Sequence, residues 1–338
     1  MSFSLPDGEW VATITDCRTN SRGTIITTFT AEMCLAVYAC AHVGAFSAWK
    51  GWDNMQVFQL VKSVLDENYS KIPETQQKRD ALICKQINAL MKGYSALSSK
   101  NGVTYDEPSV RFAYIYKYVT CHSNLVYQRI QGCKALRSCF QGSQIVVSCI
   151  GGGPGSDLVG ILKYISDLSN VEDAKVPKLR CFILDGENAW ADAWSDVDDK
   201  LETDSKISTY FIPMDVTNKS AWSQQSKYLG ADLFSMIYFA SEIYSKRHEC
   251  APFFKNLFAQ MKPGALLLYI DNNSPCFTDW FDLLVKTGGL EVLQSDEKTA
   301  KMPFDEEKTT LGEYLDKFSS VKLEANIAYR IWRKPKQS

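Results

Sequence analysis

The sequence predicts an α/β protein built on a doubly wound, seven-stranded sheet, mostly parallel with its last strand antiparallel, and preceded by a helical N-terminal region. Three observations predict this class. Before residue 142, apolar residues recur at helical spacing. After it, short apolar runs alternate with amphipathic stretches, which is typical of strands connected by helices. The first of these runs ends in a cluster of glycines.

The chain before residue 142 is expected to be mainly helical. Apolar residues at helical spacing predict four helices, at Ala31–Ala48, Asn54–Leu65, Gln76–Leu97 and from Pro108 to about Ile130. A short hairpin is expected near the start of the chain, around Ser21-Arg22-Gly23. We therefore predict that residues 1–141 form a helical lid or substrate cap, and that residues 142–338 form the sheet domain.

Seven short runs in the second region are predicted to be strands: Gln144–Ile150, Leu179–Asp185, Thr209–Met214, Asp232–Phe239, Ala265–Asp271, Leu290–Gln294 and Ala325–Arg333. The first five are continuously apolar, as expected for parallel strands buried on both faces. Helices are expected at Ser156–Leu168, Ala189–Leu201, Ser220–Leu229, Cys250–Met261 and Phe277–Lys286. The last two strands lack a full helix between them, which predicts a final antiparallel pair.

The composition is that of a soluble globular protein, with 45% hydrophobic and 22% charged residues in a chain of 338. The net charge of −2 provides no general attraction to nucleic acid or anionic membrane, so neither DNA nor a membrane is expected as a partner. The 11 cysteines include no C-x-x-C pair, which favours a reducing compartment over disulfides or a metal site. We expect a cytoplasmic protein, with the nucleus left open, and the oligomeric state is not indicated.

The strongest chemical signal is Gly151-Gly152-Gly153-Pro154-Gly155, which follows the first predicted strand and precedes a predicted helix that begins Ser156-Asp157. Glycines at such a turn permit unusual backbone angles and let a ligand come close to the main chain. The first N–H groups of the helix then point toward that ligand. A ligand-binding strand-to-helix turn is predicted here.

The spacing of Gly151, Gly153 and Gly155 resembles the first motif of class I S-adenosylmethionine-dependent methyltransferases. The dinucleotide fingerprint fits less well, because Ser156 stands where its third small residue belongs, and the phosphate-binding loop lacks its Gly-Lys-Ser/Thr ending. One position departs from the family, which often has an acidic residue two places before the first glycine, where this chain has Cys149. The resemblance implies a Rossmann-like fold over residues 143 to about 334 and S-adenosylmethionine as cofactor.

The resemblance also implies which residues meet the cofactor. Asp185, at the end of the second strand, would accept hydrogen bonds from the ribose hydroxyls, with Glu187 as a nearby competitor and a solvent-facing strand-end acid as the alternative. Asp215, after the third strand, would meet the adenine amino group, or merely cap a turn. The remaining implied cofactor contacts are Gly151, Gly152, Gly153, Gly155, Asp157, Val216, Phe239 and Ala240.

The acceptor is expected beside the carboxyl ends of the strands, next to Glu242 and to Asn272 after the fifth strand. Glu242 and His122 are the candidate general bases. A lid is expected from one helical stripe that contains Arg111, Tyr114, Tyr118 and His122, where arginine could bind an anionic group and tyrosines could exclude water. The alternative is that these aromatic residues only pack helices together.

The sequence therefore predicts a methyltransferase that acts on an unidentified acceptor, with a small molecule favoured. An RNA or protein acceptor is the alternative, and the pI near 6.0 and the absence of an Asn-Pro-Pro-Tyr sequence speak against RNA. A protein that senses S-adenosylmethionine without catalysis is the alternative from another class. Metal-dependent transfer is not supported, because no histidine has an evident metal-binding partner, although Asp271 leaves it open.

Overall fold

The computed structural model describes residues 55–97, 104–171, 175–199, 207–301 and 308–336, together with four short strands near the start of the chain. The chain divides into two compact units, Met1–Trp49 and Lys50–Ser338. The second unit contains the sheet together with the helices that precede it. A functional boundary at residue 142 stays a prediction.

The first unit contains two small antiparallel sheets. β1 (Ser2–Ser4) pairs with β2 (Val11–Thr13), and β3 (Cys17–Thr19) pairs with β4 (Ile25–Thr27). The strands β3 and β4 stand on either side of the turn expected around Ser21-Arg22-Gly23. The helix predicted at Ala31–Ala48 lies outside the described residues.

The second unit is built on a seven-stranded sheet of order β10-β11-β9-β8-β5-β6-β7. β5, β6, β7, β8 and β9 pair in parallel, and β11 runs antiparallel to both β9 and β10, which confirms the predicted class. β5 and β8 are neighbours, so the strand order reverses between them, and ligands bind at such a switch point. The strands are β5 (Gln144–Ile150), β6 (Lys178–Asp185), β7 (Ile207–Pro213), β8 (Leu233–Ile237), β9 (Leu266–Asn272), β10 (Glu291–Lys301) and β11 (Glu324–Arg333).

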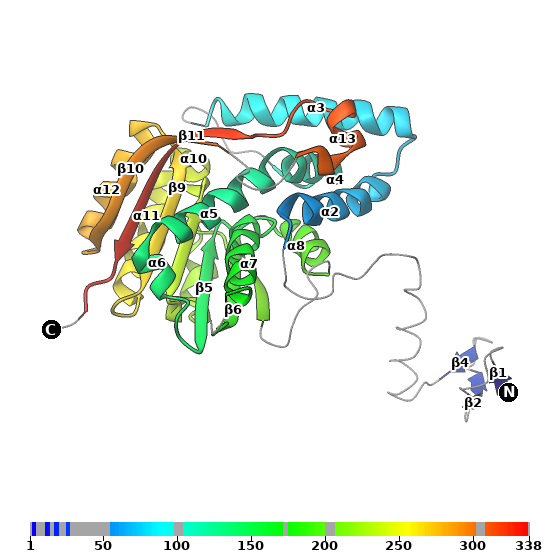
Figure 1. Cartoon of the computed structure of the whole chain (residues 1–338), viewed down its shortest axis with the longest axis horizontal. Coiled ribbons are helices and arrows are strands. Elements are labelled where there is room, and N and C mark those ends of the chain that lie inside the picture. Colours follow the sequence, from blue (N-terminus) through cyan, green and yellow to red (C-terminus); the bar gives the residue numbers. More distant parts are fainter. Residues whose placement is uncertain are drawn as a thin grey trace. The chain divides into compact units, whose positions relative to one another are not determined.

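Helices cover both faces of this sheet (Figure 1). On one face, alternate strand side chains such as Phe182, Phe234 and Tyr269 join a core with aromatic residues of α11 and α12. On the other face, α7 packs between the sheet and α5. The helices that follow β5 are α7 (Ser156–Ser169), α8 (Trp190–Asp198), α9 (Lys219–Ser223), α10 (Phe239–Ile243), α11 (Arg247–Gln260), α12 (Pro275–Thr287) and α13 (Glu313–Lys317).

Several predicted bounds were wrong. The sixth strand, expected at Leu290–Gln294, extends over Glu291–Lys301. The single helix expected at Ser220–Leu229 is instead the short α9 followed by a 3-10 turn at Lys227–Gly230. The Asn218 side chain caps α9 by accepting from the Ser220 N–H, and its last turn ends at Gln224. The fourth strand, expected to reach Phe239, ends at Ile237 because Tyr238 takes a left-handed conformation that starts α10.

The helices before the sheet first form a cap over one of its ends, and the last two then run down one of its faces (Figure 1). They are α2 (Val57–Lys71), α3 (Gln76–Tyr94), α4 (Pro108–Tyr114), α5 (Thr120–Gly132) and α6 (Lys134–Ser138). A π-helical turn at Ile115–Val119 joins α4 to α5 without a break. α5 packs so closely on α7 that a Cβ added to Gly160 would come within 2.3 Å of the Ser123 carbonyl oxygen.

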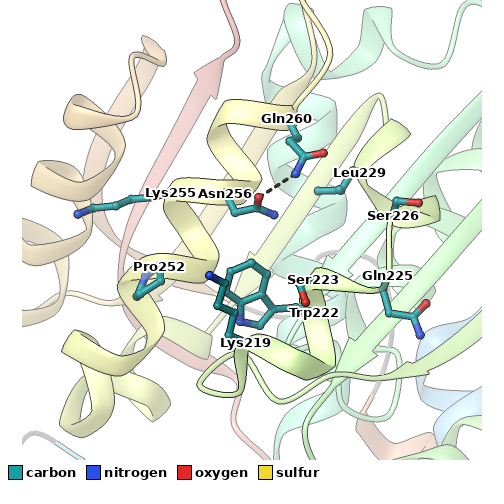
Figure 2. A pocket seen from close by; sticks show the side chains of 10 residues that line it. All are labelled: Lys219, Trp222, Ser223, Gln225, Ser226, Leu229, Pro252, Lys255, Asn256 and Gln260. Atoms are coloured by element: carbon teal, nitrogen blue, oxygen red, sulfur yellow. Dashed lines mark hydrogen bonds between the residues drawn. The ribbon is translucent and has the colours of Figure 1, made fainter.

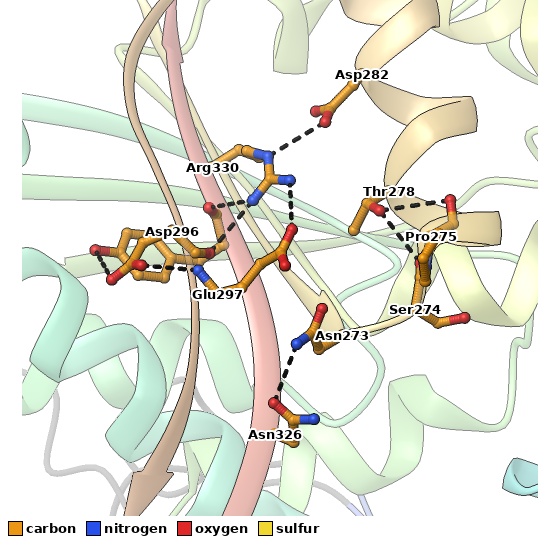
Figure 3. Close-up of polar contacts among 10 residues, drawn as sticks. Asn273, Ser274, Pro275, Thr278, Asp282, Asp296, Glu297, Asn326 and Arg330 are labelled. Carbon is orange, nitrogen blue, oxygen red and sulfur yellow. Dashed lines mark hydrogen bonds and ion pairs between the residues drawn. The ribbon is translucent and has the colours of Figure 1, made fainter.

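The C-terminal strand is tied to its neighbours by Arg330 (Figure 3). This buried guanidinium donates to Asp282 Oδ2 on α12 and to Glu297 Oε1 on β10, each over 3.3 Å. The bonds stabilise the edge of the sheet away from the switch point. No helix among the described residues is long and apolar enough to cross a membrane.

Candidate functional site

The predicted glycine turn connects β5 to α7 at the carboxyl end of the sheet. Gly151, Gly153 and Gly155 have φ values of +67°, +48° and +85°, which only glycine adopts easily. Neighbouring aromatic rings also leave no room for a side chain at two of these positions. A Cβ on Gly151 would come within 2.1 Å of Phe239 Cδ2, and one on Gly155 within 2.4 Å of the Trp194 ring. The turn is therefore shaped both by its backbone and by two aromatic residues.

Asp185 is attached to this turn. The Gly153 N–H donates to its Oδ2 and the Glu187 N–H to its Oδ1, each over 2.9 Å. Burial raises the pKa of Asp185 to about 6, although these backbone bonds oppose the shift. Glu187 uses its own carboxylate to accept from the Ala189 N–H over 3.1 Å, just before α8. Asp185 is therefore better placed than Glu187 to meet a ligand at the turn.

Asp157 lies beneath the turn rather than at its surface. Its side chain is 3% exposed, and its Oδ2 accepts from Ser235 Oγ on β8 over 2.6 Å. Burial raises its pKa to about 7. The Asp157 side chain thus joins α7 to β8. The cofactor contact that the resemblance implies for Asp157 stays a prediction, and only its backbone would be free to make it.

Asp215 and Val216 follow β7 at the same edge. Asp215 is exposed, and its Oδ1 accepts from the backbone N–H and the hydroxyl of Thr217, over 2.9 and 2.7 Å. This is the turn-capping arrangement considered as the alternative, and it leaves Oδ2 without a hydrogen-bond partner among the described residues. The Val216 side chain is buried in the core, so only its backbone could face a ligand.

The carboxyl end of β8 is held in a strained conformation. Tyr238 has a φ of +57°, the only positive value at a non-glycine position in the described residues. Such a conformation costs about 1–3 kcal/mol and persists where surrounding contacts enforce it. Here the Tyr238 N–H donates to the Ile270 carbonyl over 2.7 Å, and Asp271 Oδ2 accepts from the Ser241 N–H over 2.9 Å. β9 thereby fixes the start of α10.

Glu242 projects from α10 toward the helical cap. Its Oε1 accepts from the Tyr94 hydroxyl over 2.9 Å, and the Tyr105 hydroxyl, which is hydrogen-bonded to that of Tyr94, lies 3.4 Å from the same oxygen. Burial raises the pKa of Glu242 to about 8, with further contributions from the negative charges of Asp185 and Asp271. With this pKa, Glu242 is mostly protonated at pH 7 and becomes a proton acceptor as the pH rises toward 8 and above.

Aromatic rings surround Glu242 on the cap side. Tyr105 and Tyr114 lie against Trp190, with ring centroids 4.7 and 5.2 Å apart, and Tyr94 meets Tyr118 edge-on at 5.1 Å. Tyr114 and Tyr118 come from the predicted lid stripe, which the structure does place over the carboxyl end of the sheet. Four of these rings, excepting Tyr94, are almost completely buried, which keeps water away from the site.

His122 continues the stripe and stacks on Tyr238, with ring centroids 4.3 Å apart. Burial, assisted by the charge of Lys322, lowers the pKa of His122 well below its usual range, so the ring is neutral at neutral pH. Its Nε2 has no hydrogen-bond partner in the part of the chain that the structure describes. The role of His122 as a base stays a prediction.

Arg111 and Asn272 lie at the edge of the site. Arg111 Nη1 donates to the Tyr105 and Asp106 carbonyls, over 2.8 and 2.7 Å, and so holds the segment that carries Tyr105. Its predicted contact with an anionic acceptor has no support in these bonds. Asn272 Nδ2 donates to Ser241 Oγ over 3.2 Å, which keeps it next to α10. Ala240 is buried in the core, and Phe239 covers Gly151.

Five residues of the site escaped the sequence prediction: Tyr94, Tyr105, Trp190, Tyr238 and Lys322. Lys322 precedes β11, and its Nζ donates to the Tyr238 hydroxyl over 3.1 Å while lying 4.3 Å from the centre of that ring. These residues come from separate elements, so no local sequence spacing predicts that they meet. The excess of tyrosine between residues 94 and 118 was the available signal.

A cavity of about 460 Å³ lies elsewhere, between α9 and α11 (Figure 2). Polar side chains such as Lys219, Lys255 and Asn256 line it together with Trp222, and none of the predicted site residues does. Among the described residues, no group of three or more His, Cys, Asp or Glu side chains could hold a metal ion. The predicted site residues thus lie at the strand ends and outside this cavity.

Comparison with known proteins finds similarity in solved structures alone. No protein-family model matches the chain, and no curated protein matches it. An O-methyltransferase family protein from Burkholderia thailandensis is 12% identical, with 91% of this chain and 85% of that chain covered and a TM-score of 0.47. NodS, an N-methyltransferase from Bradyrhizobium japonicum in complex with S-adenosyl-L-homocysteine, is 11% identical, with 74% and 99% covered and a TM-score of 0.40.

A third structure, of a SAM-dependent methyltransferase from Methanosarcina mazei, is 10% identical, with 60% of this chain and 98% of that chain covered and a TM-score of 0.39. At these values the likeness describes a distant similarity of chain arrangement. It says nothing of which acceptor this chain uses, so its function has to be inferred from its own residues.

Proposed function

We propose that the chain is an S-adenosylmethionine-dependent methyltransferase that acts on a small molecule. The observation that carries this proposal is the hydrogen bond from the Gly153 N–H to Asp185 Oδ2 at the switch point of the sheet. It joins a glycine turn to a strand-end carboxylate at the place where an open α/β sheet binds its ligand. The glycine spacing favours adenosylmethionine over a nicotinamide dinucleotide.

The residues present fit such a cofactor. A Cβ on Gly153 would lie 3.7 Å from the Trp190 ring and 3.9 Å from Asp185 Oδ2, so its absence exposes backbone between an aromatic face and a carboxylate. Each Asp185 oxygen accepts one N–H and keeps a lone pair for a hydroxyl donor. We assign the ribose to Asp185, the adenine to the Asp215 carboxylate and the Val216 backbone N–H, and the remaining part to Gly151 and Phe239.

When bound, S-adenosylmethionine supplies a methyl group on a positively charged sulfur. The chain's own part is to position the acceptor and exclude water, which accounts for most of the catalysis in a direct displacement. The buried rings of Tyr105, Tyr114 and Trp190 exclude water. In its ionised form, Glu242 can take up a proton that leaves the acceptor, because its pKa of about 8 makes it a stronger base than an ordinary carboxylate.

A small acceptor is favoured because the cap closes over the strand ends. Tyr94 and Tyr105 reach from the cap to Glu242, so the surface around this carboxylate is enclosed by side chains of the same chain. A macromolecular acceptor would need an open surface there.

Calorimetric titration of the full chain with S-adenosylmethionine, S-adenosylhomocysteine and NAD tests the cofactor. We expect both sulfur compounds to bind and NAD not to bind. Asp185→Asn should weaken binding by about tenfold to a hundredfold, the value of hydrogen bonds to a charged group. Asp279→Asn, the same change at an exposed position on α12, should have no effect. Binding of NAD alone would refute the proposal, and binding without transfer to any acceptor would favour a sensor.

A further inference from the structure

Glu242 has one carboxylate oxygen that the protein uses and one that it leaves open. The Tyr94 hydroxyl donates to Oε1 and is itself hydrogen-bonded to the Tyr105 hydroxyl, which also lies near Oε1. Oε2 has no hydrogen-bond partner among the described residues, although the side chain is only partly exposed. Oε2 is therefore free to accept a hydrogen bond from a ligand. A donor on the acceptor molecule would supply that partner.

The charges around this oxygen are mostly negative. Asp185 and Asp271 lie at the same strand ends, and their negative charges help to raise the pKa of Glu242. The cation that faces them is Lys322, which donates a hydrogen bond to the Tyr238 hydroxyl. Burial raises the pKa of Asp271, and the charge of Lys322 acts against that rise. No described lysine or arginine forms an ion pair with Glu242. A ligand with a positive charge would balance this excess, whereas an anionic one would add to it.

The rings beside Glu242 suit the same kind of ligand. Tyr94 packs edge-on against Tyr118, and Tyr105 edge-on against Tyr114, with centroids 5.1 and 5.5 Å apart. The faces of such rings carry partial negative charge and attract ammonium groups, by about 2 kcal/mol or more where water is excluded. The cap thereby combines a carboxylate with aromatic faces, which is the chemistry that selects an organic cation.

We propose that the methyl acceptor is an amine, which binds in its protonated form with an N–H donated to Oε2 of Glu242 and its charge against the tyrosine rings. This inference rests on the proposed function and adds the substrate class. One ammonium proton passes to Oε2, which leaves a neutral amine and a carboxylic acid. The nitrogen lone pair then forms the N–C bond to the methyl group, while the C–S bond breaks, its electron pair stays on sulfur and the positive charge moves to nitrogen.

Three probes that share one scaffold test this class: 2-phenylethylamine, 2-phenylethanol and 3-phenylpropionate. Each is titrated calorimetrically at pH 8.5 into the full chain saturated with S-adenosylhomocysteine. We expect the amine to bind at least about tenfold more tightly than the alcohol, and the carboxylate to bind most weakly. Glu242→Gln should remove the preference for the amine and leave the affinity for the alcohol nearly unchanged. Asp279→Asn, on the exposed side of α12, should preserve the preference.

Equal or tighter binding of the alcohol or the carboxylate would overturn the amine assignment, and so would amine binding that survives Glu242→Gln. Binding of S-adenosylhomocysteine with no binding of the amine would overturn it as well, and would leave the proposed cofactor intact. Failure of S-adenosylhomocysteine itself to bind refutes the proposed function, and the acceptor assignment with it. The two failures are thus told apart in one series of titrations.

Discussion

The imidazole ring of His122 lies flat against the phenol ring of Tyr238, with 4.3 Å between centroids and 17° between planes. His122 belongs to α5, and Tyr238 directly follows β8. One ring stack therefore joins the helical cap to the strand end that leads to Glu242. Because the two parts touch here, substitutions on one side should alter the other.

Gly151→Ala should destabilise the protein and weaken binding of S-adenosylhomocysteine. The new Cβ would come within 2.1 Å of the Phe239 ring, at a backbone φ of +67°. We expect the free energy of unfolding to fall by about 2–4 kcal/mol in urea denaturation. Gly230→Ala is the matched control, because nothing lies within 4 Å of its added Cβ. Similar losses in both variants would show that contact with Phe239 does not matter.

Tyr238→Gly should be more stable than Tyr238→Ala by about 1 kcal/mol. Both variants lose the stacking with His122 and the bond from Lys322, so their difference reports the backbone alone. Glycine tolerates the φ of +57° that alanine resists. Thermal and urea unfolding of the two variants measure the difference. If alanine proves the more stable, the left-handed conformation of Tyr238 is not a source of strain.

Glu242→Gln should stabilise the ligand-free protein increasingly as the pH rises. The folded-state pKa of Glu242 is about 8, above the usual 4.5, so the folded protein retains a proton that the unfolded chain loses. Wild-type stability therefore falls between about pH 5 and pH 8, and glutamine removes this contribution. Melting temperatures of both proteins at pH 5.5, 7 and 8.5 measure the effect. A difference that stays constant across these values would contradict the raised pKa.

Ser235→Ala should destabilise the protein more at pH 8.5 than at pH 5.5. Ser235 Oγ donates to Asp157, whose pKa is about 7, so the carboxylate needs this donor mainly when it is ionised. We expect a loss of about 1–3 kcal/mol at the higher pH. Ser148→Ala is the control, because buried Ser148 donates over 2.7 Å to the carbonyl of Tyr228, which does not titrate. A loss with the same pH profile in both variants would contradict the argument.

The parallel strands could be predicted closely because they are continuous apolar runs, whereas β10, expected at Leu290–Gln294, extends to Lys301 through polar residues that gave no apolar signal. β5 was predicted at its observed bounds, Gln144–Ile150, since glycines follow it at once. β8 was predicted two residues too long, because tyrosine does not signal a left-handed turn and Tyr238-Phe239 continues the apolar pattern. The prediction of a single helix at Ser220–Leu229 was wrong because the amphipathic pattern continues across residue 223, where α9 ends.

The site was predictable where it follows strand ends and not where it depends on the cap. Asp185 and Glu242 could be named because parallel strands bring their carboxyl ends to one edge. Tyr105, Trp190 and Lys322 approach that edge from three separate segments, and only tertiary packing brings them together. The burial that raises the pKa of Glu242 likewise depends on residues distant in sequence.

The π-helical turn at Ile115–Val119 sets the rotational phase of one long helix. It holds one residue more than an α-helical turn, and that residue rotates everything after it by about 100° around the axis. Tyr114 stands before this turn and His122 after it, yet the Tyr114 hydroxyl lies 3.5 Å from His122 Nδ1. Deleting a single residue there would leave both halves helical but turn His122 away from Tyr238. The alignment of cap and strand end thus depends on a count of residues as much as on their identity.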